Sequence, residues 1–279
     1  MLTVCLPLLI LSKESHTLTN IRFLLVFSSL FILLTGATFA APVTPGTLSQ
    51  QQQAAELAPK SNKLSFEKAN PNQRYIYDVY YKSISIGEMK QEYRWKGKNV
   101  AVNSVADFSF LLFSFGGSQQ SDIYWNQQQQ QFLSRSFFRE SIGFSTVDMT
   151  ASFDPTGHHS KVINNGEQSE YTNLEGPIVD FNTINLQISE GLKVGKTNFE
   201  FYMQTSDDIA HYFFEVKGKE MIKTKFGELE AYRVQQVRKK DRTFIAWFAP
   251  RFDHQMVKFE YQRKVLDING ELIKYSTDF

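Results

Sequence analysis

From residue 74 onward, apolar and polar side chains alternate along most of the chain, which is the pattern of half-buried β-strands. Residues 75–81 have the sequence YIYDVYY, and a second run follows over residues 84–95, in which Gly87 predicts a β-bulge. Turn residues separate later runs, for example at Asp154–Gly157 and Asn164–Gly166, and the last turn is expected at Asp267–Gly270. About thirteen antiparallel strands are predicted, so the fold class is mainly β. They form either one large curved sheet or two β-rich halves, in a half-barrel-like arrangement.

One segment has a helical period instead. After Pro177, the spacings of three, three, four and four residues place five apolar side chains on one helical face. These are Ile178, Phe181, Ile184, Ile188 and Leu192. Proline is favoured in a first helical turn, and Gly191 weakens the end. We expect one amphipathic helix near residues 177–191, packed across the sheet.

The N-terminal region has the parts of a secretory signal peptide. Arg22 precedes an uncharged apolar run over residues 23–34, and Thr38 and Ala40 supply the small residues before a cleavage site after Ala40. A membrane anchor is the alternative, but twelve helical residues span only about 18 Å of a hydrocarbon core of about 30 Å. Residues 1–17 fit a translation start assigned too early. We therefore expect a signal peptide over residues 1–40 and a periplasmic protein of the cell envelope of a Gram-negative bacterium.

Residues 41–72 are rich in Pro, Gln, Ala and Ser and have little apolar periodicity, which predicts a flexible leader. Residues 73–279 then form a single β-rich domain. No stable transmembrane segment is expected after cleavage.

Charge and cysteine content exclude several classes of protein. The 279 residues include 30 basic and 29 acidic side chains, a balance that argues against nucleic acid as a partner. The single cysteine, Cys5, excludes a disulfide framework and any multi-cysteine zinc site within one chain. We expect no metal and no cofactor.

Two regions resemble a known protein family. The opening YDVYYKSISIGEMKQEYRW is similar to the first hairpin of the exported bacterial family known as domain of unknown function 3108. Near the C-terminus, VKGKEMIKTKFGELEAYRVQQ and RTFIAWFAPRFDHQMVKFEYQ match that family's Gly turn and aromatic W-F-A-P strand end, with Met256 in place of a proline. The resemblance covers about Tyr75 to Tyr275. It implies an exported β-rich domain with no established reaction.

Few residues have the arrangement of a catalytic site. There is no Gly-x-Ser-x-Gly motif and no phosphate-binding glycine loop. Asp253 and His254 are adjacent, and His211 follows Asp207–Asp208, so a carboxylate–histidine pair for general base chemistry is a weak hypothesis at either place. An ordinary strand or turn histidine is the simpler interpretation of both.

The aromatic segment over residues 108–115, FSFLLFSF, is the stronger candidate for a function. It is either a core strand or an apolar lip that lines a cavity or a membrane surface. Together with one tryptophan, it supplies the candidate ligand-binding residues Phe108, Phe110, Phe113, Phe115 and Trp247.

These observations favour a non-enzymatic protein that binds a lipid or other hydrophobic ligand, or an envelope protein partner. Two alternatives stay open: a hydrolase acting on an envelope polymer through Asp and His, and a structural interaction module. An apolar cavity would favour the first function, a polar cleft with paired titratable groups the second, and a flat exposed apolar strand the third.

Overall fold

The computed structural model describes residues 70–110, 113–143 and 146–278, with the side chain of Phe113 left undescribed. The expected signal peptide over residues 1–40 and nearly all of the expected leader lie outside these residues. Within them the chain forms fifteen β-strands in one sheet, together with one α-helix and one short 3-10 helix.

The first eight strands follow one another along the chain in a continuous meander. They are β1 (Gln73–Tyr81), β2 (Ile84–Lys96), β3 (Asn99–Phe110), β4 (Phe113–Asn126), β5 (Gln131–Ile142), β6 (Val147–Phe153), β7 (His159–Asn164) and β8 (Glu167–Thr172). In the hairpin of β1 and β2, Val79 pairs with Gly87, and the register shifts directly after this pair. The bulge predicted at Gly87 is therefore confirmed. The glutamine run after Asn126 forms the turn between β4 and β5.

The remaining elements return toward the first strand. They are β9 (Ile178–Val179), α2 (Phe181–Lys193), β10 (Asn198–Gln204), β11 (Ile209–Thr224), β12 (Gly227–Val237), β13 (Thr243–Ala249), η2 (Pro250–Phe252), β14 (Gln255–Arg263) and β15 (Leu266–Thr277). The turn expected at Asp267–Gly270 is wrong, because those residues lie inside β15 and the turn falls at Lys264–Val265. Strand β8 was not expected from the sequence because almost all of its residues are polar and exposed.

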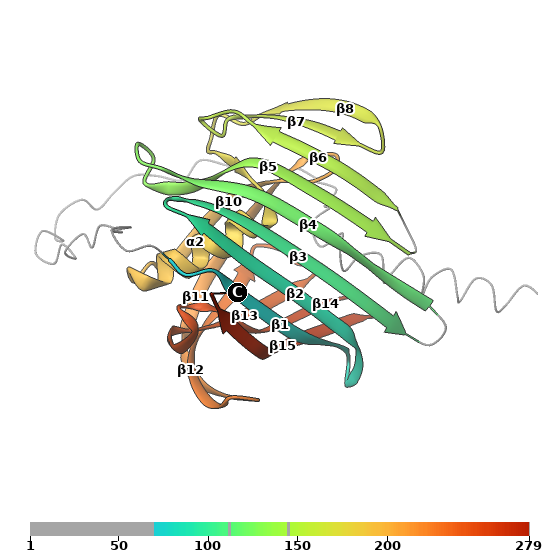
Figure 1. Cartoon of the computed structure of the whole chain (residues 1–279), viewed down its shortest axis with the longest axis vertical. Helices are drawn as coiled ribbons and strands as arrows, with labels where there is room; N and C mark the ends of the chain where they lie inside the picture. The colour runs from blue at the N-terminus through green and yellow to red at the C-terminus, as the bar shows by residue number, and fades with distance from the viewer. Residues whose placement is uncertain (1–69, 111–112, 144–145, 279) are drawn as a thin grey trace, which may run out of the picture.

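The sheet has the order β8-β7-β6-β5-β4-β3-β2-β1-β15-β14-β13-β12-β11-β10-β9 (Figure 1). Strand β1 lies in the middle, where it pairs antiparallel with both β2 and β15. Among the strands that the structure describes, β9 and β10 form the one parallel pair. Of the two predicted arrangements, the single large curved sheet is therefore the one that forms.

Strong curvature brings the two ends of the sheet close together. The amide of Ile178 in β9 donates to the carbonyl of Gly157, next to β7, at 2.7 Å. The Ser160 hydroxyl on β7 donates to the Gln204 side chain on β10. A small apolar cluster, formed mainly by Phe137, Met149 and Val162 with Ile178, fills this junction.

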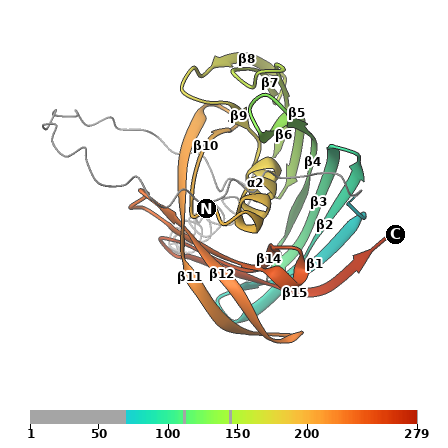
Figure 2. The same ribbon diagram turned by 90° about the vertical axis from the view of Figure 1, so that its left-hand side faces the viewer.

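Helix α2 lies in the hollow of the curved sheet, with β10–β12 on one side and β1–β5 on the other (Figure 2). It begins at Phe181 rather than near Pro177, because Ile178 and Val179 pair with β10 and Asp180 is the N-cap. The Asp180 side chain accepts hydrogen bonds from the Thr183 amide at 3.0 Å and the Ser121 hydroxyl at 2.9 Å. This capping fixes the start of the helix against β4.

The helix is more deeply enclosed than an amphipathic surface helix. Its apolar residues Ile184, Ile188 and Leu192 are buried, as its period predicts. Its polar residues Asn182 and Thr183 are also fully buried, however, and bond to serines on β4 and β5. The helix thus contacts protein on its polar side as well as on its apolar side.

Candidate functional site

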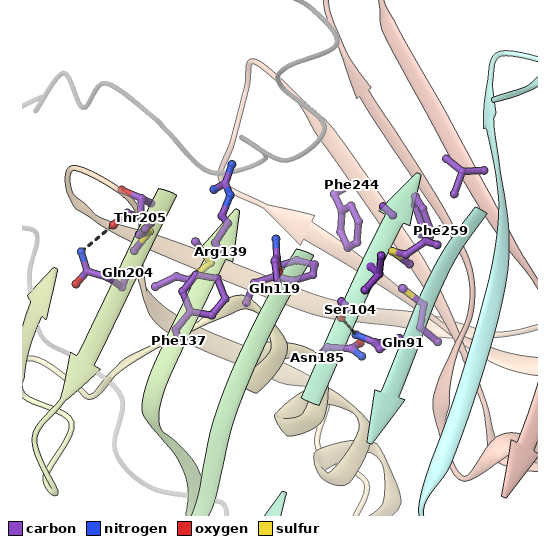
Figure 3. Close-up of a pocket in the computed structure, with 18 of the residues that line it drawn as sticks. Gln91, Ser104, Gln119, Phe137, Arg139, Asn185, Gln204, Thr205, Phe244 and Phe259 are labelled. Atoms are coloured by element: carbon purple, nitrogen blue, oxygen red, sulfur yellow. Dashed lines mark hydrogen bonds between the residues drawn. The ribbon is translucent and has the colours of Figure 1, made fainter. Parts of the chain in front are cut away.

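A partly open cavity lies between the inner face of the sheet and helix α2 (Figure 3). About 100 Å³ is open to the centres of water-sized molecules, which is several times the 10–15 Å³ that about one water needs. Strands β2–β6 contribute to one wall, β13 and β14 to another, and β10 and α2 contribute further lining residues. This is the space in which a ligand could be held.

Methionine and phenylalanine dominate the walls. Of the six methionines in the chain, four line the cavity, together with five phenylalanines. These residues are Met89, Met149, Met203, Met256, Phe108, Phe137, Phe181, Phe244 and Phe259. Methionine is unbranched and flexible, so it adapts to irregular apolar shapes. The walls are therefore suited to an apolar occupant.

Two glycines allow close packing in the strands that carry Phe108 and Phe259. Phe259, Gly270, Val79, Gly87 and Phe108 follow one another in register across β14, β15, β1, β2 and β3. The Phe259 ring lies over Gly270, where a Cβ atom would be only 2.2 Å from the ring. Gly87 has a φ of +142°, a conformation that favours glycine, and a Cβ there would meet the carbonyl oxygen of residue 107.

A row of polar side chains crosses the floor of the cavity. Gln91 on β2, Ser104 on β3, Gln119 on β4 and Arg139 on β5 are successive register partners, and all four line the cavity. The Gln91 amide donates to the Ser104 hydroxyl at 3.1 Å. The rest of the inner surface is mostly apolar, so this row is where a polar group of a ligand would be recognised.

Arg139 is the unusual member of the row. Its side chain is buried, and neither its Nε nor its Nη2 has a hydrogen-bond partner among the residues that the structure describes. Burial lowers the pKa of this guanidinium to about 10, which still leaves it charged at neutral pH. Arg139 is not among the site residues that the sequence predicts. Its alternation with Phe137 along the chain is the one signal that could have indicated an inward-facing position, and in β5 Phe137, Arg139 and Ser141 are all buried.

The predicted aromatic segment forms the adjoining ends of β3 and β4. Phe108 lines the cavity and packs against Phe115, with ring centroids 5.5 Å apart. Phe110 is partly buried and contacts the Tyr81 ring at 5.3 Å. Phe113 begins β4, but its side chain is outside the described part of the structure. Phe108 alone of these four residues is among the cavity-lining residues that the structure describes.

Trp247 lies on β13 but not among the cavity-lining residues. Its indole N–H donates to the Glu220 carboxylate, and the Lys258 ammonium lies 4.8 Å from the centre of its ring. The neighbouring Ala246 is buried and pairs with Phe259, which does line the cavity. Because successive strand residues point to opposite faces, Trp247 is directed away from this space.

Asp253 and His254 do not form a hydrogen-bonded pair in the structure. Both have left-handed backbone conformations, with φ values of 57° and 58°, in the turn after η2. The Asp253 carboxylate pairs instead with Lys193 at 2.8 Å. The His254 ring packs near Tyr232, and burial lowers its pKa. The two side chains therefore make separate structural contacts.

His211 does have a carboxylate partner, but not the one suggested by its sequence neighbours. Its Nε2 lies 2.8 Å from the Glu200 carboxylate on β10, and its ring stacks on Tyr202 with a centroid distance of 4.2 Å. The side chains of both His211 and Glu200 are more than one-third exposed. The pair lies on the surface and is separate from the cavity.

Within residues 70–110, 113–143 and 146–278, no group of three or more His, Cys, Asp and Glu side chains is arranged to hold a metal ion. No helix in the same part of the chain has the length and apolar character needed to cross a membrane.

Comparisons with known proteins identify a family and a fold. A search of curated proteins finds no match. A crystal structure from Brucella abortus, described as a beta-barrel-like protein of domain of unknown function DUF1849, is similar with a TM-score of 0.52 and 11% sequence identity. The match covers 74% of this chain and 98% of the other, and at this identity it shows a shared fold alone. The family model described as Protein of unknown function (DUF3108) matches residues 76–272, well over half of the chain. The chain therefore belongs to the DUF3108 family, as its opening hairpin and its W-F-A-P strand end indicate.

Proposed function

We propose that this protein binds an apolar ligand in the cavity between the curved sheet and helix α2, without catalysing a reaction on it. The single observation that carries the proposal is the cavity itself, with four methionines and five phenylalanines in its walls. Phe108 then serves as a binding residue, whereas Trp247 and the Asp253–His254 turn serve the structure around it.

The energetics of packing support a ligand. Protein interiors are close-packed, and unfilled core volume costs about 24 cal/mol per Å³ in measured cases. The apolar side chains that face this space of about 100 Å³ have few packing partners on that side. An apolar ligand that occupies the space recovers packing contacts and leaves water, both of which favour binding.

The proposed location is the periplasm. The N-terminal Arg22, the apolar run over residues 23–34 and the small residues before Ala41 support export across a membrane. In that compartment, a protein with an apolar cavity would hold a lipid or another water-insoluble envelope molecule away from solvent.

Native mass spectrometry of the purified protein, followed by organic extraction, tests the proposal directly. A co-purifying apolar molecule is the expected result. The same protein, after extraction and refolding, should bind the neutral fluorescent probe N-phenyl-1-naphthylamine with one site per chain. A ligand-free mass together with no saturable binding of the probe would overturn the proposed function.

A matched pair of variants tests whether the probe binds in the cavity. Ala106 is buried in the cavity wall, whereas Ala101 is exposed on the opposite face of the same strand. Ala106→Leu should weaken probe binding at least fivefold, and Ala101→Leu should leave it unchanged. Ala106→Val is the smaller step if the leucine variant does not fold. Equal binding by the Ala106 and Ala101 variants would mean that the probe binds elsewhere.

A further inference from the structure

Arg139 is the only charged side chain among the described residues that line the cavity. It is 7% exposed and projects from the inner face of β5, where Gln119 on β4 and Met149 on β6 are its register partners. Figure 3 shows it between Gln119 and the pair Gln204–Thr205, above Phe137. A charged side chain is rarely buried in an apolar core unless it is paired.

No acidic side chain among the described residues neutralises this charge. The Nε and Nη2 of Arg139 are buried and have no hydrogen-bond acceptor among the described residues. Burial of an unpaired cation carries a large desolvation cost, and natural proteins normally pair such groups. An acceptor from outside the protein would remove that cost.

Other arginines of the same chain show what a paired guanidinium looks like. Arg135, four residues earlier on β5, bonds to the Asp122 carboxylate at 2.7 Å on the solvent side. Arg242 has a largely buried side chain but is held by Asp241 at 2.7 Å. Arg139 differs from both because its surroundings are apolar side chains, amides and hydroxyls of the cavity wall.

We infer that the natural occupant of the cavity is an amphiphile: an apolar chain that ends in an anionic oxygen group, a carboxylate or a phosphate, which binds the Arg139 guanidinium. This inference rests on the proposed function and adds the chemical class of the ligand. The guanidinium presents several N–H donors in a plane and is matched by such oxyanions in two-point hydrogen bonds. The methionine and phenylalanine side chains contact the chain of the amphiphile.

The polar side chains near Arg139 are consistent with an anionic group bound at this position. Gln119 borders Arg139, and Gln204 and Thr205 lie on its other side, so amide and hydroxyl groups surround the position of the anion. The Gln204 side chain is itself held by the Ser160 hydroxyl and by its own donation to the Thr205 carbonyl at 2.9 Å. The head-group end of the cavity is thus built of positioned polar groups, while the opposite wall at Phe244 and Phe259 is apolar.

The test compares ligands that share one chain and differ only in the head group. Dodecanoate, dodecyl phosphate and 1-dodecanol are titrated at pH 7.5, below their aggregation concentrations, against protein loaded with N-phenyl-1-naphthylamine. We expect at least one of the two anions to displace the probe at a concentration tenfold or more below that needed for the alcohol. Comparison of dodecanoate with dodecyl phosphate identifies which anion the site prefers.

Arg139→Met should reduce the preference for anion over alcohol to about one, with binding of the alcohol retained. Arg135→Met, the same substitution at the exposed, ion-paired arginine of the same strand, should leave the preference unchanged. Urea unfolding of the ligand-free Arg139→Met protein should show at least wild-type stability, because the variant no longer buries a charge that has no acceptor among the described residues. Arg139→Lys, which keeps the charge without the planar donors, should retain part of the preference.

The outcomes separate the two proposals. Equal binding of the anions and the alcohol by the wild-type protein, or an unchanged preference in a folded Arg139→Met protein, would overturn the inference and leave the apolar cavity as the binding site. Failure of the probe and of all three dodecyl compounds to bind would overturn the proposed function itself.

Discussion

Gly270 lies where strand β15 crosses the cavity wall, and its replacement by alanine is a sensitive test of the described packing. A Cβ atom at this position would lie 2.2 Å from Cε1 and 2.5 Å from Cζ of Phe259. Ordinary contacts between carbon atoms are about 3.5–4.0 Å, so the ring edge must move by roughly 1.3 Å or more. The open side available to the ring is the cavity, which Phe259 lines.

The change in stability on Gly270→Ala follows from two opposing contributions, the cost of overpacking and the gain from replacing glycine. Overpacking of a filled core typically costs about 1–3 kcal/mol. Alanine is better than glycine in a strand by about 0.5–1 kcal/mol, and the backbone at Gly270 is not left-handed, so this gain applies in full. We therefore expect Gly270→Ala to lower the free energy of unfolding by about 1 kcal/mol. The displaced ring also removes about one methylene of ligand contact, or about 0.8 kcal/mol, which weakens binding of an apolar chain about fourfold.

Urea unfolding followed by tryptophan fluorescence measures the first quantity, and displacement of N-phenyl-1-naphthylamine measures the second. Phe259→Leu provides room for the new methyl group, so the double variant should be more stable than the sum of the two single changes by at least about 0.5 kcal/mol. Strict additivity of the two substitutions, with unchanged probe binding in Gly270→Ala, would refute the placement of the Phe259 ring between Gly270 and the cavity.

Three further predictions concern the helix cap and the surface histidine. Asp180→Ala removes the N-cap and leaves the Thr183 amide and the Ser121 hydroxyl without their buried acceptor. Urea unfolding should therefore show that the free energy of unfolding falls by about 2–4 kcal/mol. A fall of less than about 1 kcal/mol would contradict the buried cap. Burial raises the pKa of Asp180, so its protonated form is favoured in the folded state. The stability that it contributes is present at low pH and is lost as pH rises above the ordinary aspartate range, with a slope of at most about 1.4 kcal/mol per pH unit. Unfolding of Asp180→Asn measured across pH 3–7 should lack this loss, and parallel pH profiles would refute the assignment. His211→Ala removes an exposed pair with Glu200, so the free energy of unfolding should change by less than about 1 kcal/mol. Binding of the probe should not change. A loss of ligand binding would show that this surface belongs to the site.

Local sequence patterns predicted the strands well because side chains in a strand alternate between two faces whatever the rest of the fold does. The bulge at Gly87 and the runs that became β1–β3 could be recognised in this way. The pattern failed where local preference was weak or overridden. Strand β8 has almost no buried side chain, and Ile178 fits both the helical period of the following segment and the parallel pair with β10 that it forms.

The candidate site was less accessible from the sequence. Alternation shows that Ala246 and Trp247 face opposite ways, but not which of them faces the hollow of the sheet. The aromatic content predicts both Trp247 and Phe108 as ligand-binding residues. In the structure Trp247 packs against Lys258 and Glu220, whereas Phe108 lines the cavity.

The sequence by itself determined the class of fold, the alternation of faces along each strand and the apolar stripe of the helix, because these depend on residues a few positions apart. Only the tertiary structure decided that all the strands join one sheet and that the sheet curves around the helix. The same curvature encloses the polar side of that helix and puts Arg139 inside a cavity. The row formed by Gln91, Ser104, Gln119 and Arg139 exists because four strands pair in one register, and it has no fixed spacing along the chain. Burial, and the lack of an acid partner among the described residues, make Arg139 a candidate for recognition, and both are properties of neighbours that only folding brings together.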